Sequence, residues 1–198
     1  MATQFSMLQI MNAALIAQGQ DEIVSENDGS NEWRLLSRNW PLIVEAELED
    51  GAYNFTREQR ELLTRSAGKY GYEDAYVVPL TALHVRRLWT QDEAGVRSFP
   101  DWTQDGEKVY VDAASGVYVE MIVVSTEDLW SANFSRGVQC KLEAVICRAI
   151  KEEPTEAREM EAMGEEYFAK ARTKSSKSRS ATQPYKGGQL AAARFRRG

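Results

Sequence analysis

The 198-residue sequence contains one histidine and two cysteines, which limits the commonest catalytic and metal sites. A Ser-His-Asp or Cys-His arrangement would require His84, and no nucleophile motif accompanies it. His84, Cys140 and Cys147 also lack the close paired spacing of a zinc site. No glycine-rich loop matches a phosphate-binding motif. We therefore expect no enzymatic activity, no metal and no cofactor, with His84 held in a strand or loop by a local hydrogen bond.

Long hydrophobic runs are also missing. No apolar stretch approaches the ~20 residues that a membrane-spanning helix needs, and the N-terminal segment lacks the basic region and apolar block of a signal peptide. Cys140 and Cys147 lie about 10 Å apart along a predicted helix, too far for a disulfide. These absences predict buried, reduced cysteines, a cytoplasmic location and no membrane partner.

Acidic residues are absent from the last part of the sequence. Residues 1–169 hold 15 Lys/Arg and 30 Asp/Glu, a net charge of −15, whereas residues 170–198 hold 9 Lys/Arg and no acid, a net charge of +9; together they give −6. A basic tail beside an acidic body indicates that the tail contacts something else. Nucleic acid, an acidic partner and a neighbouring subunit are the three candidates.

Apolar residues recur at helical spacing in four segments, at about residues 5–18, 30–50, 126–150 and 155–172. Ser30 and Ser125 are predicted to cap the second and third helices, and Pro41 is expected to kink or break the second. The acids near the end of the second helix are predicted to form a solvated face, with a catalytic pair as the alternative; they are Glu45, Glu47, Glu49 and Asp50.

The apolar period changes toward two between the second and third helices, which predicts strands at about 75–80, 85–89, 108–112 and 117–124. Residues 57–67 are expected to form one or two helical turns. The predicted fold class is α+β: mainly a helical bundle of about four helices with a small inserted antiparallel β-domain and an extended C-terminal arm. The bundle comprises residues 1–56 and 125–172, the β-rich insertion 57–124, and the basic arm 173–198.

Five tryptophans are many for this length. Trp33, Trp40 and Trp130 lie on helical apolar stripes, which predicts core packing. Trp89 and Trp102 flank the loop QDEAGVRSFPDW. Because aromatic residues are enriched at interfaces, we predict a subunit or tail interface formed by Trp89, Phe99 and Trp102.

The basic arm, TKSSKSRSATQPYKGGQLAAARFRRG, could bury little surface by itself, which predicts disorder in the free subunit. Leu190 and Phe195 are apolar anchors of the kind found in segments that order on binding a protein. The alternative is nucleic acid, with Lys and Arg on phosphates and Tyr185 and Phe195 stacked on bases. Because the acidic body would repel DNA, protein docking is favoured.

Several short motifs occur in a characteristic order: AALIAQGQDEI, then Ala52-Tyr53-Asn54-Phe55, YVVPL with VRRL, VYVEMIVV, and LWSANFSRGVQCKLEAVICRAI. In this order they resemble the head-to-tail adaptor proteins of tailed bacteriophages, called tail tubular protein A in short-tailed phages. The resemblance covers about residues 8–172. The family's proline before the aromatic segment is missing here, where Gly51-Ala52-Tyr53 stands instead.

The resemblance implies a non-enzymatic protein at the virion neck. Copies would form a dodecameric ring under the portal protein, assembled in the host cytoplasm, with tail or nozzle proteins as further partners. DNA would pass through the channel without specific binding, and acidic walls would suit that passage. The family's C-terminal extension docks on the portal, and that role falls here on Tyr185, Lys186, Leu190, Arg194, Phe195, Arg196 and Arg197. The alternative function is a DNA-binding accessory or packaging protein that uses the basic tail.

Overall fold

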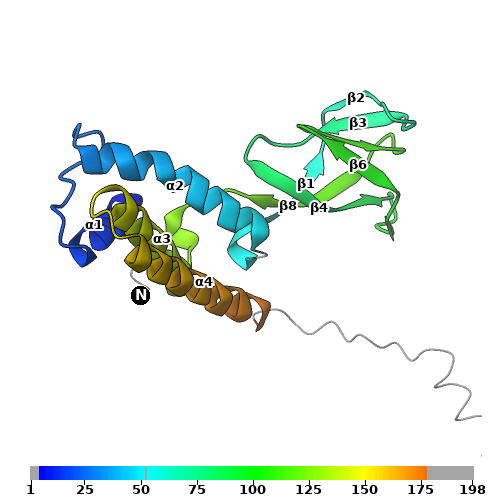
Figure 1. Cartoon of the computed structure of the whole chain (residues 1–198). Helices are drawn as coiled ribbons and strands as arrows, with labels where there is room; N and C mark the ends of the chain where they lie inside the picture. The colour runs from blue at the N-terminus through cyan, green and yellow to red at the C-terminus, as the bar shows by residue number, and fades with distance from the viewer. Residues whose placement is uncertain (1–4, 52, 178–198) are drawn as a thin grey trace, which may run out of the picture.

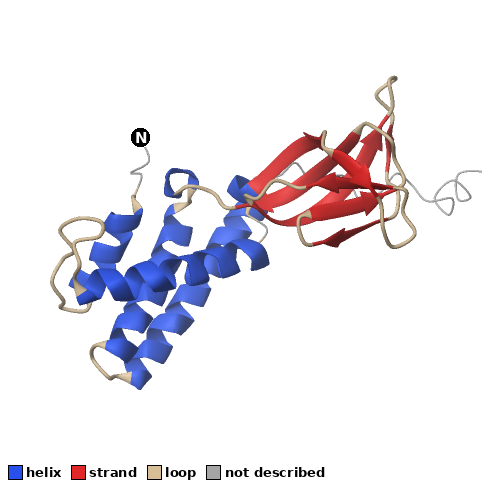
Figure 2. Cartoon of the chain, turned by 90° about the horizontal axis from the view of Figure 1, so that it is seen from above, coloured by secondary structure: helices blue, strands red, loops and turns tan. Residues whose placement is uncertain are grey.

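The computed structural model describes residues 5–51 and 53–177 (Figure 1). About 46% of these residues are helical and 23% lie in strands. Helices and strands separate into two lobes (Figure 2). The helical lobe is formed by the two ends of the described sequence and the β lobe by its middle, so the polypeptide crosses between the lobes twice.

The described helical lobe has four α-helices: α1 (Met7–Ala17), α2 (Asn31–Asp50), α3 (Ala132–Ala149) and α4 (Pro154–Lys177). α1 begins with a capping box, in which Ser6 Oγ accepts from the Gln9 backbone and Gln9 Oε1 accepts from the Ser6 backbone. The Ser30 side chain accepts from the backbone N–H of Trp33 at the start of α2. α3 is central, because it packs against each of the other three helices.

Three predicted helix boundaries change. α2 continues through Pro41 without a break, and Pro41 is exposed, where water can reach the carbonyl that a proline leaves without a donor. The third helix does not begin at Ser125; a short 3-10 turn, η2 (Glu127–Leu129), comes first, and Ser131 caps α3. α4 ends at Lys177, so the first five residues of the basic arm are helical.

α3 and α4 approach closely where two glycines meet. A Cβ on Gly164 would lie 3.3 Å from the carbonyl oxygen of Gly137, and a Cβ on Gly137 would lie 2.6 Å from the ring of Phe168. The missing side chain of Gly137 makes room for Phe168, which is fully buried, and that of Gly164 lets the two helix backbones approach. Cys140 and Cys147 of α3 are free and buried, which confirms that prediction.

The described β lobe contains two four-stranded antiparallel sheets. The first has the order β1-β8-β4-β5 and the second β2-β3-β7-β6. The strands are β1 (Arg57–Leu62), β2 (Arg65–Ala67), β3 (Asp74–Val77), β4 (Ala82–Gln91), β5 (Arg97–Ser98), β6 (Trp102–Asp105), β7 (Lys108–Val111) and β8 (Val117–Val123). A 3-10 turn, η1 (Asn54–Thr56), leads from α2 into β1.

The predicted fold class, mainly a helical bundle with a small β insertion, is wrong. The β part has two sheets, one curled as a half-barrel, and an apolar core of its own that includes Tyr76, Leu88 and Met121. Residues 57–67 form β1 and β2 and not helical turns. β1 pairs with β8 from Arg57 opposite Ile122 to Leu62 opposite Val117.

A cluster of aromatic rings connects the helical lobe to the start of the β lobe. Phe134 of α3 lies at its centre. Ring centroids of Trp130, Tyr53, Phe55 and Phe168 lie 4.7, 4.9, 5.3 and 5.4 Å from that of Phe134. The predicted core positions of Trp33 and Trp40 are confirmed, and Trp130 packs half-buried against the same core. No helix among the described residues is long and apolar enough to cross a membrane.

Candidate functional site

The end of α2, the segment leading into β1 and the last turns of α4 meet where the basic arm leaves the body. We call this cluster the arm root and define it as Glu47, Tyr53, Asn54, Arg172 and Ser175. Its members come from two segments more than 100 residues apart in the sequence. They are joined by the hydrogen bonds described below, which fix the end of α4 to the junction between the lobes.

Glu47 of α2 is the central acid of the arm root. It is 9% exposed, and its Oε1 accepts from the Arg172 guanidinium at 2.6 Å and from the Tyr53 hydroxyl. Burial raises the pKa of Glu47, while the Tyr53 hydrogen bond and the Arg172 charge oppose that rise. Asp50 lies 3.8 Å from the same guanidinium. Oε1 of the buried Glu47 carboxylate therefore has two donors, Tyr53 and Arg172.

Tyr53 is fully buried beside Gly51. A Cβ on Gly51 would lie 2.0 Å from the Tyr53 ring, so a side chain at that position would displace the ring. Burial raises the pKa of the Tyr53 hydroxyl, and the hydrogen bond to the Glu47 carboxylate raises it further. The hydroxyl therefore stays protonated and acts as a donor.

Asn54 and Ser175 form the second link of the arm root. The backbone N–H of Asn54 donates to Ser175 Oγ at 2.6 Å, and Asn54 Nδ2 donates to the Ser175 carbonyl oxygen at 2.7 Å. The carbonyl oxygens of the last helical turn have no partner within a helix, and Asn54 supplies one here. The final described turn of α4 is thus attached to η1.

The polar groups of the arm root are hydrogen-bonded to one another. Among the described residues, no group of three or more His, Cys, Asp or Glu side chains could hold a metal ion. His84 lies on β4, and its buried Nδ1 has no hydrogen-bond partner within the part of the chain that the structure describes. The hydrogen bonds of the arm root hold the end of α4 against the junction between the lobes.

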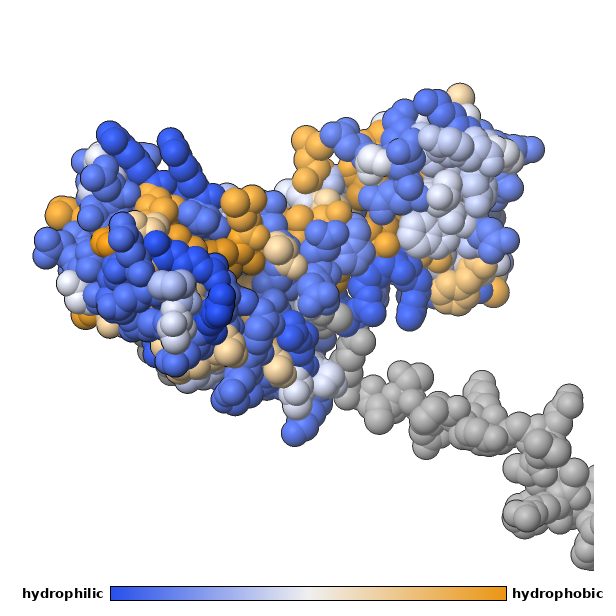
Figure 3. Space-filling view, viewed as in Figure 1, coloured by the Kyte–Doolittle hydropathy of each residue, from blue (hydrophilic) through white to orange (hydrophobic). Residues whose placement is uncertain are grey.

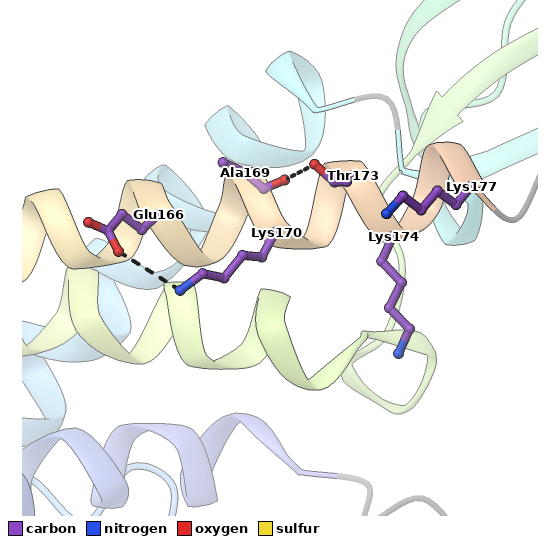
Figure 4. A pocket seen from close by; sticks show the side chains of 6 residues that line it. All are labelled: Glu166, Ala169, Lys170, Thr173, Lys174 and Lys177. Carbon is purple, nitrogen blue, oxygen red and sulfur yellow. Dashed lines mark hydrogen bonds and ion pairs between the residues drawn. The ribbon is translucent and has the colours of Figure 1, made fainter.

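The exposed side of the last turns of α4 carries three lysines. Lys170, Lys174 and Lys177 line a hollow of about 510 Å³ together with Glu166, Ala169 and Thr173 (Figure 4). Lys170 points toward Glu166, 3.8 Å away, and its ammonium lies 4.8 Å from the centre of the Tyr167 ring.

The three residues predicted to form a subunit or tail interface differ in their exposure to solvent. Trp89 is 3% exposed, because its ring stacks on Tyr118 and is covered by the Arg97 guanidinium. Trp102 is half-buried against the core of the β lobe. Phe99 is 65% exposed, so only it presents most of its ring to solvent. The predicted portal-binding residues, Tyr185 to Arg197, lie outside the described residues.

No protein-family model matches the chain, and no curated protein is similar to it.

The arm root was not predicted from the sequence. Glu47 was expected on a solvated face, but it lies on the same side of α2 as Trp40 and Val44, seven and three residues earlier. That spacing is the signal that could have indicated its burial. No local pattern indicated Arg172 and Ser175 as its neighbours, because that contact depends on how α4 packs.

Proposed function

We propose that the chain is a structural subunit of the neck of a tailed bacteriophage virion. In this proposal, copies form a ring between the portal protein and the tail, and DNA passes through the ring. The part of the basic arm beyond Lys177 docks on the portal through Tyr185, Lys186, Leu190, Arg194, Phe195, Arg196 and Arg197. The observation that carries the proposal is the arm root.

The arm root supports a docking role because it gives the basic arm a fixed origin. The Arg172–Glu47 and Ser175–Asn54 bonds attach α4 to the junction between the lobes. A segment that orders on binding loses conformational entropy, and a fixed origin limits that loss to the residues beyond the anchor. Force on the arm would also pass directly to both lobes.

A ring also requires two different contact surfaces on each subunit, one for each neighbour. Exposed large apolar residues occur on both lobes, and Figure 3 shows orange side chains on each. On the helical lobe they include Ile16, Val24 and Leu42; on the β lobe they include Leu80, Val96 and Phe99. This distribution is compatible with contacts on both sides of a subunit. The net charge of −15 over residues 1–169 would also let DNA slide, since acidic walls do not retain phosphates.

The test is to mix the purified full-length protein with purified portal and to image the product. We expect a ring attached to the portal. A truncation after Lys177 should keep the arm root but lose attachment, and the double variant Leu190→Ser/Phe195→Ser should weaken it. Portal attachment by the truncated chain equal to that of the intact chain would refute the docking role.

A DNA-binding accessory function is the second candidate, and the exposed lysines of α4 favour it, since they extend the positive charge of the basic arm onto a helix. It predicts affinity for duplex DNA that falls steeply with salt, because each neutralised phosphate releases counterions. Gel-shift titrations over a salt series, with the intact and truncated chains, would separate this function from the ring. Duplex binding that is weak for both chains and does not fall with salt would exclude it.

A further inference from the structure

One side of α4 is exposed along its length. It consists of residues three or four positions apart, which share one face of a helix. They are Glu159, Ala162, Met163, Glu166, Ala169, Lys170, Thr173, Lys174 and Lys177, all exposed. We call this surface the α4 face. Figure 4 shows its C-terminal half.

Charge is segregated along the α4 face. Glu159 and Glu166 occupy its first half, and the three lysines occupy its second half. Two other acids of α4 are already paired with α3: Glu161 with Arg148 at 2.6 Å, and Glu165 with Lys141. The acids of the helix therefore fall into two groups, one that attaches α4 to the body and one that points away from it.

Small and apolar side chains lie between the charges of the α4 face. Ala162, Ala169 and Thr173 are short, and Met163 is 38% exposed. Short side chains allow a second backbone to come close, and an exposed methionine adapts to irregular surfaces. The α4 face thus alternates short or apolar side chains with charged ones, acidic in its first half and basic in its second.

We propose that the α4 face binds a second copy of this chain, with the acidic half of one copy against the basic half of the next. This inference rests on the proposed ring and names one of its contacts. Copies that carry a net charge of −6 repel one another, so a place where opposite charges meet favours association. The two halves adjoin at the Lys170–Glu166 ion pair, 3.8 Å long, whereas Glu159 and Lys177 lie toward opposite ends of the α4 face. One copy can therefore offer each end to a different neighbour, as a ring requires.

The experiment uses the full-length protein with charges reversed at either half. The basic-half variant is Lys170→Glu/Lys177→Glu, and the acidic-half variant is Glu159→Lys/Glu166→Lys. Sedimentation velocity over a concentration series at low salt should show self-association weakened roughly tenfold or more in each. An equimolar mixture of the two should recover association, and so should a single chain that carries all four reversals.

The matched control is Arg34→Glu/Lys69→Glu, which changes the net charge by the same amount as the basic-half variant at exposed positions away from α4. It should associate much more strongly than the basic-half variant. Circular dichroism should show that every variant is folded. A wild-type chain that stays monomeric throughout, or a mixture that does not recover, would overturn the inference.

The outcome also separates this inference from the proposed ring. A closed dimer that is lost on charge reversal and restored in the mixture would support the α4 face and contradict the ring. Rings on the portal that persist in both reversed variants would support the ring and contradict the α4 face.

Discussion

Arg172 and Glu47 lie 125 residues apart and share a 2.6 Å hydrogen-bonded ion pair that fastens α4 to α2. Their side chains are 33% and 10% exposed, so the acid is the more buried partner. Replacing Arg172 by Ala would leave the Glu47 carboxylate with Tyr53 as its remaining donor. We expect the free energy of unfolding to fall by about 1–3 kcal/mol, the cost of a buried charged group that loses a partner. Urea denaturation at neutral pH measures it.

Two further variants test this interpretation of Arg172. Arg172→Lys retains the positive charge but loses the planar donor geometry, so its loss should be smaller than that of Arg172→Ala. Lys170→Ala removes an exposed charge one half-turn away and should change stability by less than about 0.5 kcal/mol. Equal stabilities of the two alanine variants would show that the ion pair contributes nothing.

Glu143 predicts a pH dependence of stability. It is 3% exposed, and burial raises its pKa above the ordinary 4.5, although Arg136 and Gln139 oppose the rise. A carboxyl whose pKa is higher in the folded state contributes stability that is complete below the unfolded pKa and is lost as pH rises through the folded pKa. Glu143→Gln removes this titration, so the stability of the variant relative to wild type should increase as pH rises from 4.5.

Urea denaturation of both proteins at several pH values from 4.5 upward measures this difference. Glutamine preserves the size of the side chain, and near-ultraviolet circular dichroism should show unchanged tertiary packing. A stability difference that is constant or declines with rising pH would mean that Glu143 is not held in a desolvated position.

Local sequence patterns located the helices but not the extent of the β lobe. Ser30 and the apolar stripe after it marked α2 well, because capping and period depend on neighbouring residues. The segment 57–62, REQREL, has residues that favour helices, yet it forms β1 because six of its residues pair with β8, about 60 positions later. Leu62 alone is buried in β1, so no alternation marked the strand.

The arm root illustrates the same limit at the level of single residues. The uneven distribution of charge predicts that the C-terminal segment contacts a partner, and composition alone is enough to make that prediction. The partners of Glu47 required knowledge of how α4 crosses α2, which no local pattern contains. Trp89 is a further case: it flanks a polar loop, but Arg97 and Tyr118 cover its ring through strand pairing.

Gly137 predicts a packing limit between α3 and α4. A Cβ at this position would lie 2.6 Å from the Phe168 ring, so glycine leaves room for that ring. Alanine favours a helix over glycine by about 1 kcal/mol, but overpacking of a filled core costs about 1–3 kcal/mol. We expect Gly137→Ala to lower the melting temperature despite its better helix propensity, as measured by circular dichroism.

The double variant Gly137→Ala/Phe168→Leu provides the control. Because leucine is smaller than phenylalanine, part of the loss from Gly137→Ala should disappear in the Phe168→Leu background, which gives a non-zero coupling in a double-mutant cycle. Strictly additive effects would indicate that the two residues do not compete for space.

The contacts of the last described turn of α4 indicate where the basic arm can be truncated without loss of folding stability. A chain that ends at Lys177 keeps Ser175 and its two hydrogen bonds to Asn54, whereas a chain that ends at Arg172 loses both. We expect the shorter chain to be less stable by about 1–3 kcal/mol, since each bond contributes about 1 kcal/mol. Chemical denaturation of the two truncated chains measures the difference.

Ser175→Ala in the chain that ends at Lys177 separates the two Asn54 bonds. It removes the Oγ acceptor of the Asn54 backbone N–H but leaves the carbonyl oxygen that binds Asn54 Nδ2. Its stability should therefore lie between those of the two truncated chains. If both truncated chains and this variant unfold at the same denaturant concentration, Ser175 does not fix the end of α4. Truncation at Arg172 would then be as valid a test of portal docking as truncation at Lys177.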